Sequence, residues 1–113
     1  MNKSVPLSPN FLAAFEGFIE KVNKMLAADN ECRYPGSPVP FVVPDKPGIK
    51  VIRLIRYAGE GGSGSSYCFV DKANGDVLKC ESWKKPAPIA RGNIFNADNG
   101  IGAVGPYGAN YLR

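Results

Sequence analysis

The sequence predicts an α+β domain, in which one N-terminal amphipathic helix packs on a small antiparallel sheet of three to four strands. Apolar residues repeat at helical spacing near the N-terminus, and two apolar stretches flank an Asn-Gly turn further along. The chain also has 13 glycines and 10 prolines, which predict long irregular arms. Its 113 residues are enough for one core, so we expect residues 1–113 to form a single domain.

The helix is expected over residues 8–29, with Ser8 as its cap, Pro9 in its first turn and Asp29-Asn30 at its end. Apolar side chains at helical spacing form one broad stripe on this helix: Phe11, Leu12, Phe15, Phe18, Ile19, Val22, Met25 and Leu26. One interpretation is that the stripe covers the sheet. The other is an oligomer seam, because the spacing within the stripe of Phe11, Phe15, Phe18, Val22 and Met25 matches a heptad repeat, although so short a repeat does not hold a coiled coil by itself.

Residues 33–48 are expected to be a proline-rich connector, because its five prolines exclude a helix. Within it, Phe41-Val42-Val43 either docks on the core or pairs as a short edge strand. The antiparallel sheet is expected over residues 49–82. Its clearest strand runs from Ile49 to Tyr57, and neither face of this strand is cleanly polar, which predicts a central position.

A β-hairpin is expected from Tyr67–Asp71 and Asp76–Cys80, since Asn74-Gly75 supplies the left-handed turn conformation. Pairing Asp71 with Asp76 places Phe69 opposite Leu78 and Val70 opposite Val77. We expect Phe69 and Leu78 to face the helix. The two aspartates are interpreted as turn residues rather than a catalytic or metal-binding pair, because no third ligand is evident.

Composition argues against several classes of function. The chain has no histidine, and its three cysteines, Cys32, Cys68 and Cys80, are widely spaced, so we expect neither a metal site, nor a cofactor, nor an enzyme. We expect no membrane span and no signal peptide, since the N-terminus lacks a continuous apolar run. The expected location is the cytoplasm.

Positive charge is concentrated after the connector. Residues 46–113 hold ten basic and five acidic residues, whereas residues 1–45 hold four and five. Residues 83–113 are expected to form a basic, aromatic loop followed by a C-terminal arm. Cations beside an aromatic ring are typical of sites for single-stranded nucleic acid or nucleotides, because the cations bind phosphate and the ring stacks on a base. The candidate residues are Lys79, Trp83, Lys84, Lys85, Arg91 and Asn93. The alternative is that Trp83, Ile94 and Phe95 only attach the loop to the core.

Three motifs carry a resemblance to known proteins: FVDK-x-x-G-D-V-x-K from Phe69, W-K-x-P-A from Trp83 and R-G-N-I-F from Arg91. Over about residues 50–110 the chain resembles a group of small, mostly uncharacterised bacteriophage proteins. The resemblance implies a viral origin, with a location in the cytoplasm of a host cell or in a virion, and it implies no particular activity. The first hypothesis is therefore a non-enzymatic phage accessory protein that binds single-stranded nucleic acid or nucleotides. The second is a virion structural protein or an inhibitor of a host factor, which contacts other phage proteins or further copies of itself.

Overall fold

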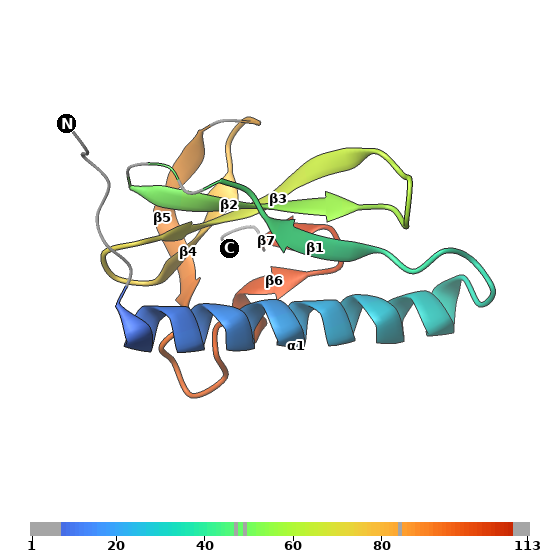
Figure 1. Cartoon of the computed structure of the whole chain (residues 1–113), viewed down its shortest axis with the longest axis horizontal. Helices are drawn as coiled ribbons and strands as arrows, with labels where there is room; N and C mark the ends of the chain where they lie inside the picture. Colours follow the sequence, from blue (N-terminus) through green and yellow to red (C-terminus); the bar gives the residue numbers. More distant parts are fainter. Residues whose placement is uncertain (1–7, 47, 49, 84, 110–113) are drawn as a thin grey trace.

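The computed structural model describes residues 8–46, 48, 50–83 and 85–109, and Lys84 and Ile49 therefore lie outside the described residues. One helix packs on a five-stranded antiparallel sheet of order β1-β2-β3-β4-β5, and a two-stranded sheet, β6-β7, lies on the same side as the helix (Figure 1). The predicted α+β class is confirmed, with more strands than the three to four expected. The elements are α1 (Pro9–Arg33), β1 (Phe41–Pro44), β2 (Val51–Tyr57), β3 (Gly64–Asp71), β4 (Asp76–Cys80), β5 (Pro86–Asn93), a 3-10 turn η1 (Ile101–Ala103), β6 (Val104–Gly105) and β7 (Gly108–Ala109).

Helix α1 covers the sheet with the predicted stripe. The Ser8 hydroxyl accepts a hydrogen bond of 3.0 Å from the Phe11 amide, and a proline follows in the first turn. The stripe belongs to the hydrophobic core, where its buried members are Phe11, Phe15, Phe18, Val22 and Leu26. The stripe therefore covers the sheet of its own chain.

The helix runs four residues beyond the predicted end, to Arg33. Asn30 does not stop it, because this residue is buried within the helix and its side-chain amide donates to the Ser37 carbonyl at 3.1 Å. The Tyr34 amide then donates to the Asn30 carbonyl at 2.7 Å, which closes the last turn of the helix. The prediction that the helix ends at Asp29-Asn30 is therefore wrong, because the contacts of Asn30 in the fold keep it helical.

Both edges of the five-stranded sheet resist pairing with a further strand. Of the two alternatives for Phe41-Val42-Val43, the edge strand is confirmed, as β1. The Asn23 side chain occupies the free edge of β1, where it accepts from the Val42 amide at 2.8 Å and donates to the Val42 carbonyl at 3.4 Å. The other edge is β5, where Pro86 and Pro88 have no N–H to donate. Strand addition at either edge is therefore disfavoured.

Strand β5 corrects the prediction that residues 83–113 begin with a loop. Its residues pair with β4, from Asp76 opposite Asn93 to Cys80 opposite Pro86, with register shifts on the way. Prolines indicated irregular structure in the sequence, but an edge strand tolerates them where its N–H groups would point away from the sheet. The basic, aromatic segment is thus a short connection between two strands.

The β3–β4 hairpin has the predicted register, with Phe69 opposite Leu78 and Val70 opposite Val77. The predicted orientation is wrong. Val70 and Val77 belong to the core under α1, whereas Phe69 and Leu78 are buried on the opposite face of the sheet. Val70 and Val77 pack there with Tyr67 of β3 and the phenylalanine rings of α1.

The two aspartates of this hairpin act as turn residues. Asp71 accepts a hydrogen bond from the Ala73 amide at 2.8 Å, and Asp76 accepts one from the Asn93 side chain at 3.0 Å. Gly75 has φ +80°, as the Asn-Gly pair predicts.

Part of the C-terminal arm also has regular structure. Tyr67 donates to the Gly105 carbonyl at 2.6 Å and holds the β6-β7 sheet against the helix side of β3. Further back, the Asn99 side chain donates to the Ala14 and Ile94 carbonyls, each at 2.9 Å, which attaches the loop after β5 to α1. Within the described ranges, no helix is long and apolar enough to cross a membrane.

Candidate functional site

The face of the sheet opposite α1, which we call the outer face, is the candidate site. Among the described residues, no helix or strand covers this face, and the connection between β4 and β5 rises beside it on the side opposite α1 (Figure 1). The outer face receives alternate side chains of four strands: Phe41, Val43, Val51, Arg53, Ile55, Tyr57, Phe69 and Leu78. It is thus largely apolar, with one arginine near its centre.

Arg53 joins three segments of the chain on this face. Its Nη2 forms an ion pair with Asp45, which follows β1, and its Nη1 donates to the Trp83 carbonyl at 2.7 Å. The guanidinium also lies 4.2 Å from the centre of the Trp83 ring, in a cation–π contact. The Arg53 side chain is only 17% exposed, and its Nε atom is buried without a hydrogen-bond partner.

The Asp45 carboxylate fixes Arg53 in place. The Arg53 guanidinium, followed by the Lys46 backbone N–H, holds the pKa of Asp45 below its usual value. The pKa of Asp45 is thus lower in the folded protein than in the unfolded chain. The stabilisation by the ion pair is therefore present above the unfolded pKa and is lost as the pH falls through the folded pKa. The ion pair therefore persists at neutral and mildly acidic pH.

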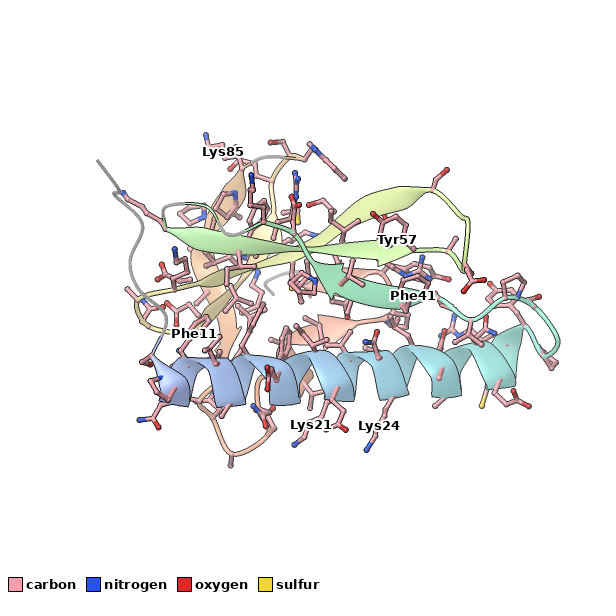
Figure 2. The ribbon with its side chains drawn as sticks, viewed as in Figure 1. Phe11, Lys21, Lys24, Phe41, Tyr57 and Lys85 are labelled. Atoms are coloured by element: carbon pink, nitrogen blue, oxygen red, sulfur yellow. The ribbon has the colours of Figure 1, made fainter. Side chains whose placement is uncertain are left out.

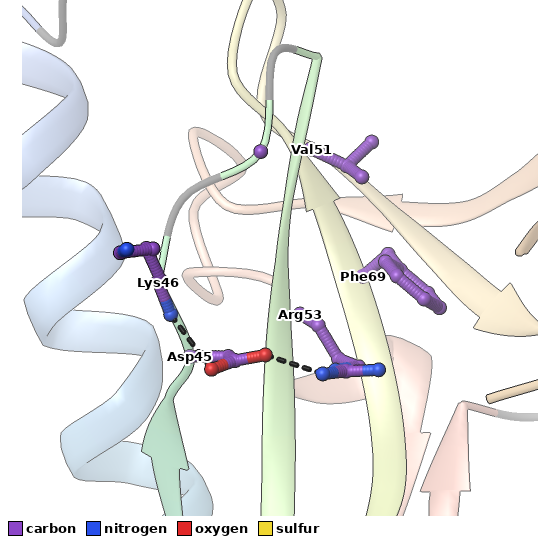
Figure 3. Close-up of a pocket in the computed structure, with 6 residues that line it drawn as sticks. Asp45, Lys46, Val51, Arg53 and Phe69 are labelled. Carbon is purple, nitrogen blue, oxygen red and sulfur yellow. Dashed lines mark hydrogen bonds and ion pairs between the residues drawn. The ribbon is translucent and has the colours of Figure 1, made fainter. Parts of the chain in front are cut away.

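A pocket of about 260 Å³ opens beside this pair. Figure 3 shows Asp45 and Arg53 facing one another, with Phe69 and Val51 on neighbouring strands. The lining is mixed: the side chains of Asp45, Lys46 and Arg53 are charged, whereas those of Val51 and Phe69 are apolar. Such a lining combines apolar contact with charged groups that can orient a ligand.

The connection between β4 and β5 presents Trp83 to solvent. The amides of Glu81 and Ser82 both donate to the Lys85 carbonyl, at 2.9 and 3.1 Å, which closes the turn. Trp83 is 46% exposed although its ring contacts Arg53. The Lys85 ammonium lies 3.4 Å from the Glu81 carboxylate, and both side chains are at least half exposed.

One comparison with known proteins gives a match. A family profile, described as a family of unknown function (DUF7717), matches residues 14–104. The chain belongs to this family. No curated protein and no solved structure matches the chain significantly. The DUF7717 match includes the whole five-stranded sheet and therefore both Arg53 and Trp83.

The structure of this DUF7717 protein brings only some of the predicted site residues together. Trp83 and Lys85 lie in the β4–β5 connection, next to the undescribed Lys84. Lys79 lies on β4 directly after the outward-facing Leu78, so strand alternation directs it toward the α1 side. Arg91 lies on β5, where its guanidinium donates to the Ile89 carbonyl.

Asn93, the remaining candidate, has a structural role. Its side-chain amide donates to the Asn74 carbonyl at 2.7 Å and to Asp76 at 3.0 Å, and its oxygen accepts from the Phe95 amide at 2.8 Å. These bonds attach the end of β5 to the β3–β4 turn. Because they use the polar atoms of the side chain within the fold, we leave Asn93 out of the proposed site.

The alternative, that Trp83, Ile94 and Phe95 only attach the segment to the core, holds for Ile94. Ile94 is 1% exposed and belongs to the core, whereas Phe95 is 51% exposed and touches Phe11 edge-on. Trp83 contacts Arg53 through its ring and its carbonyl and is still 46% exposed. Its contact with the sheet therefore leaves part of the residue open to solvent.

The cysteines on the sheet are poor nucleophiles. Burial raises the pKa of Cys68 well above its usual value, and burial also raises the pKa of Cys80, which lies 2.9 Å from the Ser66 hydroxyl. Both thiols are therefore protonated at neutral pH. In the part of the chain that the structure describes, no group of three or more potential metal ligands is found.

Proposed function

We propose that this DUF7717 protein binds single-stranded nucleic acid, or single nucleotides, on the outer face beside the β4–β5 connection. The observation that carries the proposal is the half-exposed Trp83 ring lying on the Arg53 guanidinium. A base can stack on the exposed part of the indole, which the cation beneath it holds in a fixed orientation. Stacking of this kind is sequence-tolerant, because every base has a π-face.

Cations near Trp83 support the proposal. Lys85 lies on the outer side of the molecule, opposite Lys21 and Lys24 on α1 (Figure 2). Its ion pair with Glu81 is exposed, so it contributes little to stability and opens at low cost when a phosphate binds. Lys46 lines the pocket next to Arg53 and is exposed. The chain as a whole carries a net charge of +4.

The proposal is for a binding protein without a cofactor or catalytic role. The three motifs shared with small bacteriophage proteins support an accessory protein of a phage, acting in the cytoplasm of the host. Its partners in this proposal are single-stranded nucleic acid or nucleotides, with no role at a membrane.

Exchanging Lys85 for glutamate tests the electrostatic part of the proposal. We expect Lys85→Glu to weaken binding of a thymidine oligonucleotide about tenfold or more at low salt, and to reduce the salt dependence, because each phosphate contact releases counterions. The readout is quenching of Trp83, the only tryptophan in the chain, at two salt concentrations. Lys24→Glu makes the same charge change on the opposite side of the molecule and is the control. Equal losses from both variants would reduce the effect to net charge and contradict a site at Lys85.

Removing the indole tests the stacking part. We expect Trp83→Ala to weaken oligonucleotide binding by about 1–3 kcal/mol, measured by anisotropy of a labelled strand. Trp83→Phe keeps an aromatic ring and should lose less. Wild-type affinity in the Trp83→Ala protein would show that no base stacks at this position.

A second candidate function is a protein contact at the same place. Trp83 and Ile89 are large, exposed and apolar, and the two best-placed cations, Arg53 and Lys85, already have acidic partners. These observations favour a virion component or an inhibitor of a host protein. The α1 stripe is buried within the chain and the sheet edges resist pairing, so such a contact would use the outer face. Detection of the protein in purified phage particles, together with an absence of oligonucleotide binding, would favour this candidate.

A further inference from the structure

We propose that the bound strand extends along β2, from Trp83 to a second aromatic site formed by Phe41 and Tyr57. This inference rests on the proposed function and extends it to the length of strand bound. Phe41 and Tyr57 are register partners on β1 and β2, and their rings stack with centroids 5.6 Å apart and planes inclined by 28°. Both residues are partly exposed.

Gly64 leaves space for the Tyr57 ring. The two residues are register partners on β2 and β3, and a Cβ atom at Gly64 would lie only 2.9 Å from the Tyr57 ring. Glycine here therefore lets the Tyr57 ring lie close to the β3 backbone, where any larger residue would displace it.

The spacing of the two aromatic sites fits a short strand. Arg53, under Trp83, and Tyr57 lie four residues apart on β2, which is about 13 Å at the strand rise of about 3.3 Å per residue. Stacked nucleotides advance about 3.4 Å each, so the path accommodates about four of them. Two apolar register partners lie between the two sites, Val43, which is partly exposed, and Ile55, which is 9% exposed.

The occupant is single-stranded nucleic acid rather than an extended peptide or a second copy of the chain. A peptide that recognises a sheet commonly adds a strand at its edge, and here Asn23 occupies one edge while prolines interrupt the other. The cations are gathered at the Trp83 end, where Lys46 and Lys85 lie, so phosphate is bound there. Tyr57 contributes stacking alone.

This division of roles predicts a specific dependence on strand length. Affinity should rise from mononucleotide to dinucleotide to tetranucleotide and then level off at the octanucleotide, as the path becomes filled. Because Tyr57 binds a base and not phosphate, Tyr57→Leu should lower tetranucleotide affinity about tenfold, leave mononucleotide affinity unchanged and leave the salt dependence intact. Leucine keeps apolar packing at this half-buried position, and a thermal melt verifies that the variant is folded.

The control variant is Tyr107→Leu. Tyr107 is also an exposed tyrosine over an arginine, 5.0 Å from Arg56, but it lies with the β6-β7 sheet on the α1 side. We expect the Tyr107→Leu variant to bind oligonucleotides of every length with the affinity of the wild type. The extended path would be overturned if wild type and Tyr57→Leu bound oligonucleotides of every length equally, or if both tyrosine variants lost the same affinity. In either case, quenching of Trp83 by nucleotides would still uphold the proposed function. Absence of quenching in the wild type at every length would overturn both.

Discussion

Replacing Phe18 by aspartate is expected to prevent this DUF7717 domain from folding. Phe18 is 0% exposed, at the middle of the α1 stripe that covers the sheet. An unpaired carboxylate at that position costs several kcal/mol, a large part of the roughly 5–15 kcal/mol that stabilises a domain. Circular dichroism and a thermal melt should show loss of the cooperative transition.

Leu12→Asp is the matched control for this experiment. Leu12 belongs to the same helix but is 40% exposed, and a negative charge near a helix N-terminus is tolerated or favourable. We expect this variant to fold like the wild type. A cooperative melt of the Phe18→Asp protein near the wild-type temperature would show that the stripe does not pack on the sheet.

Gly75→Val is expected to destabilise the domain by about 2–4 kcal/mol. Two effects combine, since Gly75 has φ +80°, which a β-branched residue resists, and a Cβ there would lie 2.7 Å from Phe95 and 3.0 Å from Ile94. Phe95 is exposed and its ring can turn away, but Ile94 is buried and cannot. Chemical denaturation measures the loss as a change in the free energy of unfolding.

Gly36→Val separates the two effects. Gly36 also has a positive φ, +86°, but a Cβ there would meet no atom within 4 Å. This variant should therefore lose only the conformational part, about 1–2 kcal/mol. Losses of the same size at both glycines would mean that the β3–β4 turn does not pack against the residues after β5.

Local sequence patterns predicted much of the fold correctly. The α1 stripe, its cap at Ser8 and the β3–β4 register all depend on residues close together in the chain. In the hairpin, the Asn74-Gly75 turn alone aligns Phe69 with Leu78. The position of β2 between two other strands also followed from its mixed faces.

Features that depend on distant contacts were missed. The helix continues through Asn30 because Ser37 accepts its side-chain amide, and β5 forms because β4 lies beside a proline-rich segment. The orientation of the β3–β4 hairpin depends on which alternate side chains pack under α1. Val70 and Val77 do so beside Tyr67, which leaves Phe69 and Leu78 on the outer face.

The candidate site was only partly predicted, because it too depends on contacts between residues far apart in the chain. Trp83 and Lys85 are prominent in the sequence, and both lie in the β4–β5 connection. Arg53 and Asp45 went unnoticed as site residues, because folding alone brings Arg53 to Trp83, thirty residues away. The available signal was an arginine in the middle of an otherwise apolar strand, which requires a partner once it is partly buried.

The central claim, that the outer face binds single-stranded nucleic acid, is tested most directly by nuclear magnetic resonance. The protein is labelled with nitrogen-15 and titrated with a thymidine tetranucleotide. We expect the largest shifts at the Trp83 indole N–H, at the Arg53 Nε–H, which has no hydrogen-bond partner in the structure, and at the amides around Tyr57. The exposed side of α1, around Lys24, should not shift. Shifts confined to α1, or none at concentrations that saturate Trp83 fluorescence, would contradict the account.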